Sequence, residues 1–135
     1  MTTTTAHGYN YAVVRVVPRV ERGEFINVGV ILHSRTLHFL DARVELDGPR
    51  LLALAPDISL ATVEEHLRAF CHICQGVKDA GPIALLPPQE RFYWLVAPRS
   101  TIIQTSPLHA GVTTTPAQVM DKLMDQMVRR PQARG

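Results

Sequence analysis

The sequence has little of what marks the specialised classes of protein. Two cysteines in 135 residues are too few for a small secreted domain held by disulfides. No apolar run approaches the ~18 residues of a transmembrane helix, and the N-terminus has neither the basic nor the apolar region of a secretory signal. Fourteen Lys and Arg against twelve Asp and Glu leave the chain close to neutral, so neither nucleic acid nor a membrane is expected as its partner. These absences predict a cytoplasmic protein.

The motifs of common enzyme classes are absent too. Neither a Gly-rich phosphate loop nor the Gly-x-Ser-x-Gly turn of serine hydrolases occurs. Cys71 and Cys74 match the C-x-x-C pattern, but they lie near the end of a predicted helix, where the helix dipole disfavours a thiolate. We interpret both as core residues and expect no cofactor and no metal. A metal site completed by ligands from elsewhere in the chain is the alternative.

What the sequence does contain is enough apolar material for one domain, since 46% of its residues are hydrophobic and 19% are charged. We expect a single α+β domain over residues 9–130. A disordered N-terminus at 1–8 and a basic tail at 131–135 are expected to flank it. We find no internal repeat and no second domain.

Segments rich in β-branched and aromatic residues predict the sheet. Residues 9–17, 24–32 and 36–44 are expected to form an antiparallel meander, and residues 100–105 a fourth strand. The first two segments are apolar on both faces, which is typical of strands that are covered on both sides. We therefore expect a sheet of about four strands covered by two or three helices, or by helices and a partner.

Capping residues and apolar spacing predict the helices. Asp47 caps a short helix that ends before Pro56, and Ser59 begins a longer helix that ends at Gly76. Residues 88–97 fit both a helix and a strand, and the spacing of their apolar residues favours the helix.

The last helix is predicted over residues 117–129, after a loop over residues 106–115. Apolar residues recur along this helix at helical spacing, and we expect them to pack on the sheet. Because several are methionines, an adaptable groove for a partner is the alternative. The stripe consists of Val119, Met120, Leu123, Met124 and Met127.

Arg15 is the most unusual residue, because it lies between two pairs of valines in the middle of the first strand. A charge in this setting needs a partner if it is buried. In the expected hairpin Arg15 lies across from Asn27, and Gly29 leaves space beside them. We predict that Arg15 is largely buried and pairs with a carboxylate, Glu24 first, with Asp41 and Glu45 as the alternatives. Such a group is either a network that sets the hairpin register or the floor of a binding site.

A second concentration of polar residues follows at positions 98–111. Arg99, Gln104, Ser106 and His109 are residue types that bind anions or amides. Ser100 in the same segment is a further candidate. The alternative interpretation is that these side chains only cap the strand and brace the loop that follows it.

Both polar segments resemble parts of a bacterial family of unknown function, DUF3037. Residues 11–18 and 23–30 resemble its opening signature, and its later blocks resemble residues 91–95, 98–101 and 106–111. The resemblance covers residues 9–130. It implies a small bacterial cytosolic protein that is often encoded beside a HipA-like kinase. The positions at which the family pattern has its polar residues are occupied here by Arg15, Glu24, Asn27, Gly29, Arg99, Ser100 and His109.

Three functions remain open. The first is an accessory protein that acts with a partner protein through Arg15, Glu24, Asn27 and Arg99, the HipA-like kinase being the partner that the resemblance implies. The second is an enzyme for an anionic small molecule or nucleotide, in which the arginines hold the anion and Glu24 or His109 moves a proton. The third is a structural homodimer. The missing nucleophile and cofactor motifs favour the first function over the second.

Overall fold

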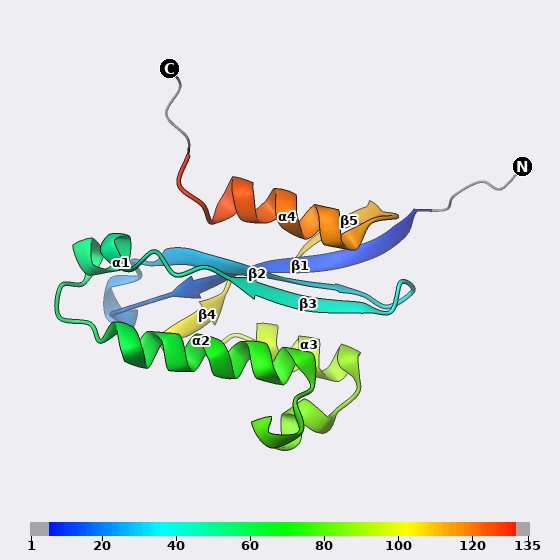
Figure 1. Cartoon of the computed structure of the whole chain (residues 1–135), viewed down its shortest axis with the longest axis horizontal. Helices are drawn as coiled ribbons and strands as arrows, with labels where there is room; N and C mark the ends of the chain where they lie inside the picture. Colours follow the sequence, from blue (N-terminus) through cyan, green and yellow to red (C-terminus); the bar gives the residue numbers. More distant parts are fainter. Residues whose placement is uncertain (1–5, 132–135) are drawn as a thin grey trace, which may run out of the picture.

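The computed structural model describes residues 6–131, which form one five-stranded antiparallel sheet and four α-helices (Figure 1). This arrangement confirms the predicted α+β fold. The strand order is β3-β2-β1-β4, and β5 pairs with the same edge of β1 as β4 does. The strands are β1 (His7–Val16), β2 (Ile26–Ser34), β3 (Phe39–Val44), β4 (Ile103–Thr105) and β5 (His109–Thr113).

The free edge of β1 is filled by two short strands that lie end to end. β4 pairs with residues 14–16 of β1, and β5 pairs with residues 7–11. Between them, the main-chain N–H of Ser106 donates to the Val13 carbonyl at 2.9 Å. The predicted loop over residues 106–115 is therefore wrong over His109–Thr113, which form β5. The physical reason is that buried main-chain groups of β1 need partners, which a short polar segment supplies without any visible alternation.

β1 and β3 begin at other residues than the sequence predicts. β1 begins at His7, so His7 and Gly8 belong to the sheet, while residues 1–5 of the expected disordered N-terminus lie outside the described residues. β3 begins at Phe39 because residues 35–38 form a turn, with His38 at a φ of 52°. Most of the expected basic tail, residues 132–135, also lies outside the described part.

The helices confirm the capping signals. The Asp47 carboxylate accepts from the main-chain N–H of Arg50 at 3.1 Å, and Ser59 Oγ accepts from that of Thr62 at 3.2 Å. Gly76 ends its helix in the left-handed region, at a φ of 72°. The helix favoured for residues 88–97 is present. The helices are α1 (Gly48–Leu54), α2 (Leu60–Gln75), α3 (Pro88–Val96) and α4 (Pro116–Met127).

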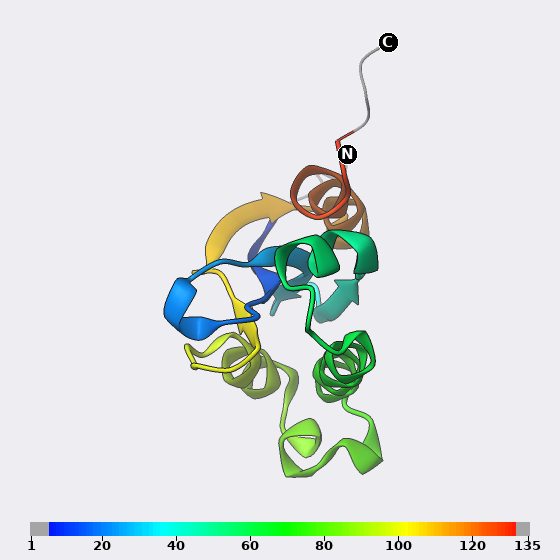
Figure 2. The same cartoon turned by 90° about the vertical axis from the view of Figure 1, so that its left-hand side faces the viewer.

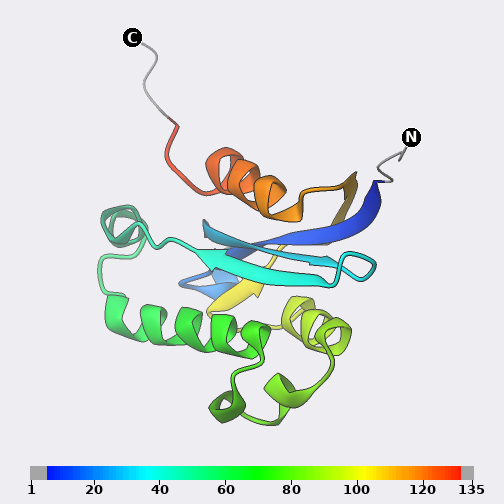
Figure 3. The ribbon, with the colours of Figure 1, turned by 45° about the vertical axis from the view of Figure 1, so that its right-hand side comes forward.

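Helices cover both faces of the sheet, as predicted from the apolar residues on both faces of the first two strands. Figure 2 shows α4 on one side of the sheet and α2 with α3 on the other, and Figure 3 shows α2 and α3 side by side beneath it. The larger core lies under α2 and α3 and includes Val14, Ile31 and Phe92. The smaller core lies under α4 and consists of Val30, Leu32, Met120, Leu123, Met124 and Val128. Three short 3-10 helices complete the chain: η1 (Val20–Arg22), η2 (Lys78–Ala80) and η3 (Pro82–Leu85).

The stripe predicted for α4 is correct except at its end. Met120, Leu123 and Met124 are buried, but Met127 is 38% exposed and Val128 takes its place in the core.

A β-bulge divides β2 into two parts that face opposite ways. Val14 pairs with Gly29 but the next residue, Arg15, pairs with Asn27, so the register skips one residue. Ile26 therefore packs in the core under α2 and α3, whereas Val30 packs under α4. An unbroken strand would place Ile26 and Val30 on the same face, because successive side chains of a strand alternate between its two faces. The space expected beside Gly29 is filled, because a Cβ placed there would overlap β3.

Candidate functional site

Arg15 lies in the register that the sequence predicts, but not with the predicted partner. It pairs across the sheet with Asn27 on β2 and with Gln104 on β4. Its side chain is only partly buried, and its guanidinium carbon lies 4.0 Å from the centre of the Phe25 ring. Glu24 forms its ion pair with Arg22 instead. The predicted Arg15–Glu24 pair is therefore wrong, because β2 begins after Glu24 and leaves that carboxylate in the exposed connection from β1.

Asn27 ties the sheet to the end of α4. Its Nδ2 donates to the Met127 carbonyl at 3.0 Å, so it satisfies a carbonyl that the helix itself leaves free. Asn27 Oδ1 and Arg15 Nε are buried and have no hydrogen-bond partner among residues 6–131. Neither side chain lines any of the cavities described below. This arrangement favours the structural interpretation of the two residues.

Glu24 lines a cavity of about 510 Å³ between the β1–β2 connection and α1. Arg19 and Arg22 line it as well, but each already pairs with a carboxylate. The charges of this cavity are thus largely neutralised within the chain.

Arg99 lies in a different setting, on the segment that follows α3. Its guanidinium carbon is 4.2 Å from the centre of the Trp94 ring, and its Nη2 donates to the Trp94 carbonyl. The segment is braced from within, since Gln104 Nε2 donates to the Thr101 carbonyl at 2.9 Å and Thr101 Oγ1 donates to the Ile103 carbonyl at 2.8 Å. Arg99 is therefore held over the ring of Trp94 with part of its side chain exposed.

Two cavities meet at Arg99 and Gln104, which line both of them. The first, of about 340 Å³, lies between α2, α3 and residues 101–105, and its lining is largely apolar, with Phe70, Ile73 and Ile102. The second, of about 550 Å³, lies between the end of α3 and residues 104–108. We call the two cavities together the Arg99 groove. Volumes of this size are typical of sites that hold a small molecule or a few side chains.

Large side chains at the Arg99 groove are exposed. Tyr93 is 47%, Trp94 39% and Leu108 41% exposed to solvent. Trp, Tyr and Arg are the residue types that contribute most to protein–protein binding. No carboxylate among residues 6–131 forms an ion pair with Arg99, whereas five other arginines do pair: Arg19, Arg22, Arg43, Arg129 and Arg130.

The remaining predicted site residues lie apart from the groove lining. The His109 ring stacks on Tyr11, with 5.1 Å between the ring centres, and Ser100 is exposed. Of the seven predicted residues, the structure brings only Arg99 and Gln104 to the same cavities. The sequence analysis missed Tyr93 and Trp94, although the chain's single tryptophan beside a tyrosine was a signal that could have identified them.

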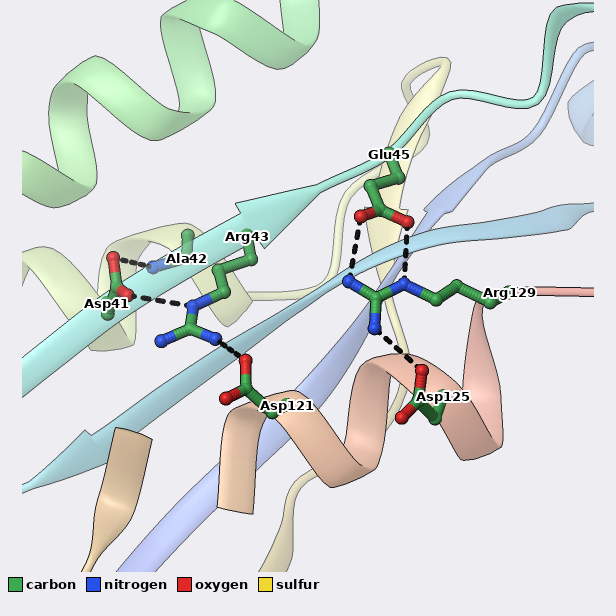
Figure 4. Close-up of polar contacts among 7 residues, drawn as sticks. All are labelled: Asp41, Ala42, Arg43, Glu45, Asp121, Asp125 and Arg129. Atoms are coloured by element: carbon green, nitrogen blue, oxygen red, sulfur yellow. Dashed lines mark hydrogen bonds and ion pairs between the residues drawn. The ribbon is translucent and has the colours of Figure 1, made fainter. Parts of the chain in front are cut away.

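The end of α4 carries a network of ion pairs that the sequence analysis did not foresee (Figure 4). Arg129 forms two hydrogen bonds with the Glu45 carboxylate, at 2.8 and 2.9 Å, and a third with Asp125 at 2.6 Å. Arg43 pairs with Asp121 in the same view. The hydrogen bonds from Arg129 hold the pKa of the Glu45 carboxyl below its ordinary value. These arginines therefore attach α4 to β3 and to the segment that follows it.

The two cysteine thiols are poor nucleophiles. Burial raises the pKa of Cys71 to about 11 and that of Cys74 to about 12, so both stay protonated near neutral pH. Within residues 6–131, no three His, Cys, Asp or Glu side chains are grouped in a way that could hold a metal ion.

A family model described as a protein of unknown function (DUF3037) matches residues 11–128. The searches of curated proteins and of solved structures found no match. In the part of the chain that the structure describes, no helix combines the length and the apolar character needed to cross a membrane.

Proposed function

The chain belongs to the DUF3037 family, and we propose that it is a binding protein that holds a partner protein in the Arg99 groove. The occupant is a surface segment of the partner that carries a carboxylate next to an apolar side chain. The carboxylate pairs with Arg99, and the apolar side chain enters the smaller cavity. The single observation that carries the proposal is an arginine without a carboxylate partner, stacked on an exposed tryptophan at the meeting point of two cavities.

Charge supports an acidic group in the partner. Five arginines of the described chain pair with its own carboxylates, but Arg99 donates from one nitrogen, Nη2, to a main-chain carbonyl. A guanidinium stacked on a ring keeps its remaining N–H donors free for a second planar group, and a carboxylate is the geometric match. Because stacking on Trp94 already restricts the side chain, little entropy is lost when the pair forms.

The lining supports an apolar anchor beside that carboxylate. Phe70, Ile73 and Ile102 present hydrocarbon to the smaller cavity, and Leu108 extends the apolar surface on the other side of Arg99. Glu24 and His109, the residues expected to move a proton in an enzyme, line neither cavity of the groove. The groove therefore has the means to bind, and neither of the two residues that the enzyme hypothesis names for proton transfer lies in it.

The first partner to test is the HipA-like kinase that the family resemblance implies. We propose that the chain acts in the bacterial cytoplasm as an accessory protein of that kinase. A purified HipA-like kinase is titrated into the wild-type chain and its variants by isothermal titration calorimetry. Arg99→Ala and Leu108→Asp are each expected to raise the Kd at least tenfold, a loss of about 1.4 kcal/mol or more.

Matched controls lie elsewhere on the surface. Arg68→Ala removes an exposed arginine of α2 that forms no ion pair within the described residues, and Leu85→Asp changes a leucine that is 66% exposed. Both controls are expected to bind as the wild type does, and circular dichroism checks that all four variants fold. If the kinase binds Arg99→Ala and Leu108→Asp unchanged, the groove is not the site. If the wild-type chain itself does not bind, the kinase is not the partner.

A further inference from the structure

The two edges of the sheet differ in how they are protected. β3 carries charged side chains along its length, and Asp41 Oδ1 accepts from the main-chain N–H of Ala42 at 3.0 Å, which occupies a donor of that strand. Arg43 extends from the same strand to Asp121 on α4. Charges on an edge strand oppose pairing with another chain, so the β3 edge is well protected.

The β5 edge has none of this protection. Its five residues are His109, Ala110, Gly111, Val112 and Thr113, which include no acid, lysine, arginine or proline. Val112 is 71% exposed, the highest value among the exposed large hydrophobic residues. Within the described residues β5 pairs with β1 alone, and Figure 2 shows it (orange) on the outer side of the molecule with no helix beyond it. Its outer main-chain groups are therefore available to another strand.

The β5 strand is also held in place before any partner arrives. His109 stacks on Tyr11, and the ring of Tyr9 lies so close to Gly111 that a Cβ there would overlap it. A strand fixed in this way loses little conformational freedom when a second strand pairs with it.

We propose that β5 is a dimerisation edge, at which a second copy of this chain pairs its own β5 in antiparallel orientation. A two-fold axis through Gly111 places Ala110 of one copy opposite Val112 of the other, and His109 of one copy opposite Thr113 of the other. No like charges meet in this register, and each exposed valine is covered by a small side chain. The two five-stranded sheets join into one continuous sheet.

The oligomeric state tests this proposal. Sedimentation equilibrium of the full chain is expected to approach twice the 15.0 kDa mass as the concentration rises. Val112→Lys adds a charge to the edge and is expected to leave a monomer. Val20→Lys replaces another exposed valine, in the β1–β2 connection, and is expected to dimerise as the wild type does.

A cross-linking variant tests the register itself. In the proposed pairing Ala110 and Val112 of different copies lie about 4.5–5.5 Å apart at their Cα atoms, which is within the range that a disulfide spans. Ala110→Cys combined with Val112→Cys is expected to form an oxidised dimer, with the introduced thiols joined between copies in the peptide mass spectrum. A wild type that stays monomeric, a Val112→Lys variant that still dimerises, or an absence of this cross-link would each overturn the proposal.

Discussion

The two faces of the sheet are covered by layers that are held in different ways. Fourteen buried residues form the core under α2 and α3, but only six form the core under α4. Around the smaller core, Asn27, Arg43 and Arg129 attach α4 through polar contacts that are largely exposed. We infer that burial of apolar surface secures the first layer, whereas α4 depends partly on contacts that salt and acid weaken.

The largest effect is expected in the core under α2 and α3. Phe92 is fully buried there and stacks on His33, with 5.1 Å between the ring centres. Phe92→Ala is expected to lower the free energy of unfolding by about 3–5 kcal/mol, because a large cavity is left. Urea denaturation followed by circular dichroism measures this loss. The exposed control Leu85→Ala is expected to stay within about 0.5 kcal/mol of the wild type, and a similar loss in both variants would contradict the prediction.

A smaller effect is expected under α4. Met120 is fully buried, and Met120→Ala is expected to cost about 2 kcal/mol, the low end of its range, because a helix at the rim can settle into the space. Met127→Ala, on the same helix but 38% exposed, is the matched control and is expected to be nearly neutral. Protease digestion compares the two variants further. In Met120→Ala the protease is expected to cleave α4 before it cleaves the rest of the domain, and in Met127→Ala it is not. Equal losses for Met120→Ala and Phe92→Ala would show that the two layers are equally secure.

Mild acid is expected to lower the stability of the protein through His33, which lies on the side of the sheet that carries α2 and α3. Burial lowers the pKa of His33 below its ordinary value of 6.5. The unfolded chain therefore takes up a proton more readily than the folded chain, so stability falls as the pH drops below that value. The midpoint of urea denaturation is expected to decrease between about pH 7 and pH 5 in the wild type. In His33→Gln that decrease should be reduced, and an unchanged pH dependence would exclude His33 as its source.

The smallest effect is expected for the ion pairs of α4. Arg129 and Glu45 are both substantially exposed, so Arg129→Met should lower the melting temperature only slightly, and high salt should remove the difference. Because the pKa of Glu45 is lowered in the folded chain, the pair contributes above its ordinary value of 4.5 and is lost as the pH falls through the lowered pKa. Arg68→Met, without an ion pair in the described chain, is the control. A difference between Arg129→Met and the wild type that persists in high salt would argue against a screened surface pair.

The helices could be predicted because their limits depend on local residues. Asp47, Ser59 and Gly76 each satisfy main-chain groups within a few positions of themselves, and those residue types are visible in the sequence. The hairpin register at Arg15 and Asn27 was predictable for the same reason. β5 and the bulge at Val28 were not, since both depend on what lies beside a strand after the chain has folded.

The candidate site was predictable only in part. Arg99 and Gln104 were identified as polar residues of a single segment, and both line the groove. The cavities themselves are formed by side chains of α2, α3 and the segment after α3, which no local pattern brings together. The choice of partner for Arg15 failed because it assumed that Glu24 lies on the strand that faces Arg15, whereas Glu24 precedes β2 and pairs with Arg22.

The central position of β1 has a consequence for how the protein is made. Its second edge is completed by β4 and β5, and the main-chain N–H of Val13 reaches Ser106 Oγ at 2.9 Å across 93 positions of the chain. On the ribosome, β1 and β2 emerge early, but one edge of that hairpin has no partner until most of the chain has been translated. A nascent chain with this connectivity exposes an apolar strand edge until β4 and β5 have been made, and a chaperone that shields that edge would raise the yield of folded protein.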